Sequence, residues 1–113
     1  MSDRLWNSRP LEPRWKAYLP TEGEIALASF TWHSVIELLE MAGRCPLEHR
    51  HLVKQLCFAR VYAERSARIV REEGAISRAP AGDDVIYSRH WINARKADVL
   101  MRRLERRLGL ALC

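Results

Sequence analysis

Six basic side chains near the end of this 113-residue sequence are the residues best suited to bind a partner by charge. On a helical wheel of 100° per residue they fall within an arc of about 140°. They are Arg95, Lys96, Arg102, Arg103, Arg106 and Arg107. A concentrated cationic face on a small domain attracts polyanions, and it binds duplex DNA by releasing counterions from the phosphates. A merely solvated helix face is the alternative.

The whole net charge of +5 lies in the last quarter of the chain. Residues 89–113 hold seven basic residues against Asp98 and Glu105, whereas residues 1–88 hold twelve basic and twelve acidic residues. Dense like charges repel at i,i+4 spacing, which is easier to understand if an anion lies opposite them. A second group of basic residues lies near the N-terminus and is the second predicted DNA contact: Arg4, Arg9, Arg14 and Lys16.

The sequence carries no recognisable catalytic or metal-binding motif. It lacks phosphate-binding and dinucleotide-binding glycine patterns, Cys-x-x-Cys and His-Glu-x-x-His. His49 and His51 would face different sides of a helix, and neither His33 nor His90 has a clear carboxylate partner in the sequence. We therefore expect no enzyme activity, no catalytic residue, no metal and no cofactor.

Cysteine spacing and hydropathy indicate a cytoplasmic protein. The three cysteines fit neither a disulfide framework nor a zinc site, and an odd number of thiols suits a reducing compartment. No stretch is long and apolar enough to span a membrane, and the N-terminus does not resemble a signal peptide.

The pattern of apolar residues, caps and breakers predicts a mainly α fold with three helices. They are expected at about 21–43, 46–73 and 89–108. Thr21 and Glu24 are spaced as a capping box, Pro46 suits the first position of the second helix, and Ser88 suits the cap of the third. The helices of this 21–113 core are expected to stop at Gly43, Gly74 and Gly109.

Two further segments complete the predicted fold. Residues 1–20 contain three prolines among basic and aromatic residues, so we expect an irregular arm that docks on its own core or on a neighbouring subunit. Residues of about 75–88 resemble a β-hairpin, because turn-forming residues 80–84 separate two short β-prone runs. The fold class is thus a helical hairpin plus a third, basic helix, with a short β-hairpin before it.

The helix at 46–73 carries two apolar stripes, which is more than one partner helix needs. The first contains Leu52, Leu56, Ala59, Ala63, Ala67 and Val70, and the second contains Phe58, Tyr62 and Ile69. We expect the second stripe to pack against another copy, together with Ile76, Ile86 and Tyr87 of the hairpin, because two strands alone are marginal in water. A helix central to its own core is the alternative.

Residues 32–110 resemble the small terminase subunits of tailed double-stranded DNA phages. The order of segments carries this resemblance: Trp32, Leu39 with Gly43, a long helix through 59–74, the hairpin 76–87 and the Arg-Leu helix 95–110. No single piece is specific, and the resemblance lies in their order and spacing.

The resemblance implies a non-catalytic DNA-packaging factor. Such subunits assemble into homo-oligomeric rings, bind the double-stranded DNA to be packaged and deliver it to the large terminase subunit, which holds the ATPase and nuclease. Many have a helix-turn-helix domain ahead of the core, and the 20-residue arm is too short to be one. This predicts DNA binding with little sequence preference in the bacterial host cell, similar to the small terminase of a gene transfer agent.

Two other functions fit the same residues. A protein-interaction adaptor could dock its basic helix on an acidic capsid or motor partner. A small DNA-binding regulator would need a recognition helix after the turn at 43–46, but the helix that follows is about twice the usual length and lacks a clear base-reading set.

Overall fold

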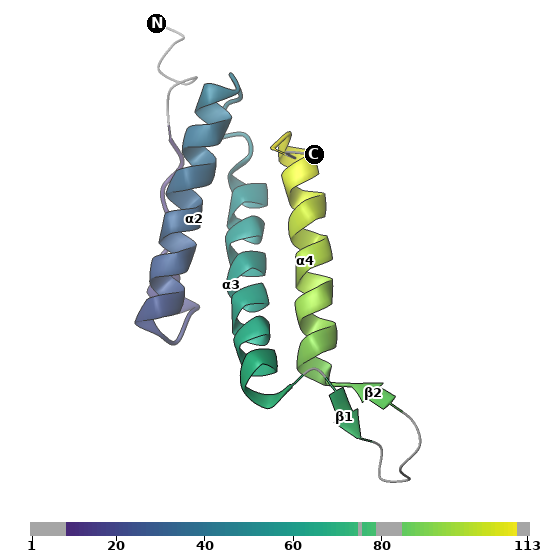
Figure 1. Cartoon of the computed structure of the whole chain (residues 1–113). Coiled ribbons are helices and arrows are strands. Elements are labelled where there is room, and N and C mark those ends of the chain that lie inside the picture. The colour runs from purple at the N-terminus through teal and green to yellow at the C-terminus, as the bar shows by residue number, and fades with distance from the viewer. Residues whose placement is uncertain (1–8, 75, 79–84, 111–113) are drawn as a thin grey trace, which may run out of the picture.

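Three helices lie side by side in a single layer (Figure 1). The computed structural model describes residues 9–74, 76–78 and 85–110. The elements are η1 (Trp15–Ala17), α2 (Glu22–Met41), α3 (Arg50–Glu73), β1 (Ile76–Arg78), β2 (Val85–Tyr87) and α4 (Arg89–Leu108). The principal extents of 69 × 31 × 16 Å reflect this layer, because the shortest is little more than one helix with its side chains. The prediction of a mainly α fold with three helices is confirmed.

The central helix α3 buries side chains on two opposite sides, because it packs against both α2 and α4. Cys57 and Val61 are completely buried on the side of Arg65, whose side chain binds α2. Leu56 and Ala59 are buried on the opposite side, which α4 covers. Two helical neighbours therefore account for most of the apolar width of α3, and the sequence analysis missed the buried row toward α2.

The second helix begins four residues later than predicted. Pro46 is buried but lies in a turn, in which the His49 N–H donates to the Pro46 carbonyl at 3.1 Å. The His49 ring also contacts the Cys45 carbonyl at 2.9 Å, which stabilises this turn. The first i→i+4 bond runs from the Val53 N–H to the His49 carbonyl, so the regular helix begins at Arg50.

The predicted capping box at the start of α2 is only half formed. The Thr21 hydroxyl accepts a hydrogen bond from the Glu24 N–H at 3.2 Å, as the pattern requires. The Glu24 carboxylate instead accepts two bonds from Arg65 of α3, from Nε at 2.7 Å and from Nη2 at 2.6 Å. This carboxylate is largely buried, so the pair fixes α2 against α3.

The arm docks on its own core. Trp15 is buried in edge-to-face contact with Trp32 of α2 and Phe58 of α3, at centroid distances of 6.1 and 5.5 Å. Glu12 fastens the same segment, because its carboxylate accepts a bond from Trp15 Nε1 at 2.7 Å and lies 3.0 Å from His33 Nε2. The arm thus covers one face of the α2–α3 pair.

A short two-stranded ladder connects α3 to α4. The strands β1 and β2 pair antiparallel, with Ile76 opposite Tyr87 and Arg78 opposite Val85. The turn predicted at 80–84 lies outside the described residues.

We predict that Glu24→Gln lowers the free energy of unfolding by about 1–2 kcal/mol, because it removes the charge that holds both Arg65 nitrogens. Urea unfolding followed by circular dichroism measures the change. Glu22→Gln is the matched control: Glu22 is exposed, lies in the same helical turn and has no ion pair in the described part of the chain. Equal losses in the two variants would contradict a specific role for the pair.

The Glu24 pair should also make stability depend on pH. Hydrogen bonding from Arg65 lowers the pKa of Glu24 below its ordinary value of 4.5, against the opposing effect of burial. Because the pKa is lower in the folded chain, this contribution is complete above about pH 4.5 and disappears as the pH falls through the folded pKa. The difference in unfolding free energy between the native chain and Glu24→Gln should therefore shrink at acidic pH, and a constant difference would contradict it.

Candidate nucleic-acid interface

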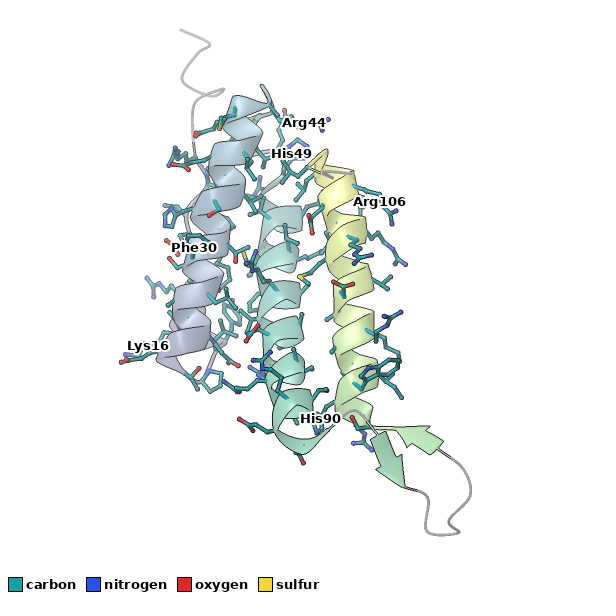
Figure 2. All side chains as sticks on the ribbon, viewed as in Figure 1. Lys16, Phe30, Arg44, His49, His90 and Arg106 are labelled. Atoms are coloured by element: carbon teal, nitrogen blue, oxygen red, sulfur yellow. The ribbon has the colours of Figure 1, made fainter. Side chains whose placement is uncertain are left out.

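Helix α4 exposes all six basic residues that the sequence analysis placed on one face. The Ser88 hydroxyl caps the helix by accepting from the Trp91 N–H at 3.1 Å, and Leu104 and Leu108 bury the opposite side in the core. All six basic side chains are exposed. Arg106 projects away from α3 along the open edge of the layer (Figure 2).

Most of these charges have no counter-charge in the described part of the chain. Arg102 forms an exposed ion pair with Asp98 at 3.2 Å, and the Arg95 guanidinium lies over the Trp91 ring at 5.5 Å. Within the described residues, the remaining four basic side chains make no ion pair: Lys96, Arg103, Arg106 and Arg107. Their charge is therefore available to an external anion.

Two exposed apolar residues divide the basic arc, a feature that the sequence analysis missed. Ile92 and Val99 are 39% and 52% exposed, and on the wheel they lie near the centre of the arc. Three basic residues lie on each flank of this pair, all of them on α4. We call Arg95, Arg102 and Arg106 the groove row, because they lie toward a groove over α3, and Lys96, Arg103 and Arg107 the arm row, because they lie toward the face that the N-terminal arm covers. Counting charge alone could not find this seam, although the spacing of seven residues between Ile92 and Val99 is visible in the sequence.

The two rows lie on different faces of the layer. Asp98 and Glu105 line a groove of about 530 Å³ over α3, and Arg102 of the groove row pairs with Asp98. The arm row lies on the side of α4 opposite to Asp98 and Glu105. It therefore shares the face on which the arm covers α2 and α3.

The groove itself carries mixed charge. Its polar lining consists of Arg60, Glu64, Asp98 and Glu105, and alanines from α3 and α4 form much of the rest. A smaller hollow of about 160 Å³ continues from it and is lined mainly by apolar residues.

The basic arm does not extend the basic surface of α4. Arg9 forms a bidentate ion pair with Glu40, at 2.9 and 2.6 Å, so its charge is balanced within the chain. Arg14 and Lys16 are exposed, but Figure 2 shows Lys16 on the opposite side of the molecule from Arg106. Arg4 lies outside the described residues.

The predicted oligomer interface is only partly exposed. Phe58 is half-buried beneath Trp15 and Tyr18 of its own arm, whereas Tyr62 is 49% exposed and Ile69 is partly exposed. The side chains of the three hairpin residues, Ile76, Ile86 and Tyr87, lie outside the described part. Phe58 is therefore used within the subunit.

The described side chains show one carboxylate–histidine pair and two buried cysteines, Cys45 and Cys57. His33 has a carboxylate partner after all, Glu12, which the sequence separation of 21 residues concealed. Because Glu12 also holds Trp15, this pair fastens the arm. Burial raises the pKa of the Cys57 thiol to about 12, so it stays protonated and fills space in the core. Within the described residues, no group of three His, Cys, Asp or Glu side chains could hold a metal ion.

Comparison with known proteins gives no match. No protein family matches the sequence, and neither a curated protein nor a solved structure matches it. None of the described helices combines the length and apolar character that crossing a membrane requires.

The last turn of α4 is held by a glycine and by an arginine from another helix end. Gly109 has φ of +75°, and Gly109 and Leu110 donate to the carbonyls of Arg106 and Glu105 in a Schellman motif. The guanidinium of Arg44, just past α2, lies where a side chain on Gly109 would be, with Cζ 2.5 Å from an ideal Cβ. This places a cation at the negative end of α4.

We predict that Gly109→Ala lowers the free energy of unfolding by about 1–2 kcal/mol, because an L-residue is strained at this φ and its Cβ would displace Arg44. Thermal unfolding checks this. The control is Gly23→Ala in the first turn of α2, where a Cβ would meet no atom within 4 Å. That change should be neutral or stabilising by up to about 1 kcal/mol, and a loss matching that of Gly109→Ala would refute the conformational explanation.

Proposed function

We propose that this chain is a non-catalytic DNA-packaging factor of the small terminase kind, acting as a homo-oligomer in the bacterial cytoplasm. It binds double-stranded DNA through α4 and presents it to the large terminase subunit. The observation that carries the proposal is the row of exposed basic side chains on α4, most of which lack a counter-charge in the described part.

Binding by this surface should depend little on sequence. Arginine and lysine on the outside of one helix reach phosphates readily, and phosphate contacts carry no base information. A packaging factor must bind DNA of any sequence, whereas a regulator must bind one operator sequence specifically. The resemblance of residues 32–110 to small terminases supports the same function, and the ring expected of such proteins would multiply weak contacts.

A second candidate function is docking on an acidic protein of the capsid or motor. Ile92 and Val99 favour it, because exposed apolar residues between charges are typical of protein contacts and contribute little to phosphate binding. A mobility shift on random duplex DNA at low salt separates the two, since an adaptor would produce none.

The test of DNA binding is the reversal of the groove row, Arg95, Arg102 and Arg106, to glutamate. We expect the native chain to retain random duplex DNA at low salt, with a log–log salt slope of about −5 if six phosphates are contacted. The triple variant should lose this retention, because three attractive contacts become repulsive. Electrophoretic mobility and fluorescence anisotropy across a salt series measure both.

A control of equal charge change reverses three exposed arginines of α3 that do not line the groove: Arg50, Arg68 and Arg71. If retention depends on position rather than on net charge, this control keeps most of it. Unchanged retention in the α4 triple variant would remove α4 from the proposal. Absence of any retention by the native chain would favour the adaptor.

A further inference from the structure

The outer edge of α2 is acidic and apolar. Helix α2 contains four glutamates and no lysine or arginine. Glu24 and Glu40 are paired within the subunit, which leaves Glu22 and Glu37 without an ion pair in the described part. Phe30 and Met41 are 65% and 83% exposed. Figure 2 shows Phe30 on the side of α2 that faces away from α3, and helical periodicity places Met41 near the same side.

This edge has the spacing of a helix-packing seam. Leu27, Phe30, Ser34, Glu37 and Met41 follow one another at alternating intervals of three and four residues. Such a repeat keeps one line of side chains toward a neighbouring helix. Leu27 and Ser34 border the hollows shared with α3 and α4, whereas Phe30, Glu37 and Met41 lie farther from α3 and have no helix against them in the described part of the chain.

The outer edge of α4 is the complement of this surface. Ile92 and Val99 lie seven residues apart, and a basic row flanks them on each side. The two helices are 20 residues each and run in the same direction, as shown by Arg44, just past the end of α2, reaching Gly109 at the end of α4. The two edges form opposite borders of the same layer (Figure 1).

The charged flanks also correspond. Glu37 lies toward the face of α2 that carries Glu40 and its partner Arg9 from the arm. The arm row of α4 lies on that same face of the layer. If a second copy continued the layer, Glu22 and Glu37 of that copy would lie beside Lys96, Arg103 and Arg107 of the first.

We infer that copies of this chain associate head to tail, with the α2 edge of one copy packed in parallel against the α4 edge of the next. The two edges differ, so the contact is not two-fold symmetric and repeats into a ring if the rotation closes. This inference rests on the assembly part of the proposed function and not on its DNA-binding part. The groove row stays open to phosphates in such an assembly.

The mixing of two edge-blocked variants tests the inference. Phe30→Glu places a charge in the seam of the α2 edge, and Val99→Glu does so in that of the α4 edge; both sites are more than half exposed. We expect each variant alone to be monomeric where the native chain is oligomeric. Mixed together, they should form a one-to-one dimer and nothing larger, because the mixture contains only one kind of intact contact. Native mass spectrometry and light scattering without DNA report the masses.

Leu11→Glu is the matched control, since Leu11 is 94% exposed but lies on the arm, and it should leave the native mass unchanged. Circular dichroism checks that every variant keeps its helices. A charge swap distinguishes loss of the contact from misfolding. Glu37→Arg and Arg103→Glu should each weaken association about tenfold, and the chain that carries both changes should regain the native affinity, because opposite charges then face each other again.

The outcomes separate this inference from the proposed function. If the native chain is oligomeric and both edge-blocked variants remain so, the edges are not the contact, while assembly itself stands. Mixed variants that stay monomeric also overturn the head-to-tail contact. A native chain that is monomeric at tens of micromolar overturns the inference and the assembly part together, whereas DNA retention is judged by its own assay.

Discussion

A single layer of three helices gives only its central helix two helical neighbours, and the rest of this structure follows from that constraint. Helix α3 is covered on both sides, so its apolar residues form most of the core with those of α2. The outer helices each keep one side open to water. The arm covers one face of the α2–α3 pair, where Trp15 packs on Trp32 and Phe58, but it adds no helix at either edge. The two outer edges are therefore without a helical neighbour in the described part of the chain.

Folding uses the charges of the two edges unequally. Two of the four glutamates of α2 form ion pairs within the subunit: Glu24 with Arg65 and Glu40 with Arg9. The arginines of α4 are hardly used, since Arg102 alone forms an ion pair among the described residues of that helix. The residual charge is thus concentrated on α4. The proposed function uses this asymmetry, because unpaired charges gathered on one helix attract a polyanion.

Local sequence signals predicted the helices well because caps act through neighbouring residues. Ser88 and Gly109 bound α4 as expected, and Thr21 begins α2. The errors arose where distant residues compete. The carboxylate of Glu24 prefers Arg65 to its own helix end, and the turn after Pro46 is held by His49 and Cys45. Local residue spacing in the sequence does not predict contacts of this kind.

The candidate surface was likewise predictable in part. The basic arc of α4 follows from helical periodicity, so all six residues were found in advance. The ion pair of Arg9 with Glu40 and the covering of Phe58 by Tyr18 could not be predicted, because both depend on where the arm docks. The buried row of α3 toward α2 was missed because Cys57 and Val61 belong to neither of the two apolar stripes found in the sequence, and the sequence of α3 does not say on which side α2 packs.

The proposed DNA binding and the inferred self-association are compatible, because the two basic rows of α4 lie on different faces of the layer. A seam of Ile92 and Val99 contributes little to phosphate binding, but it suits a helix whose exposed side chains are Phe30 and Met41. A subunit that offers DNA only the three side chains of the groove row holds it weakly at physiological salt. Repetition of the groove row around an assembly raises the effective concentration of each further contact, so weak and sequence-indifferent binding becomes a useful hold. In the proposed assembly, the apolar seam in the middle of the basic arc would bring the copies together and so make the basic surface effective.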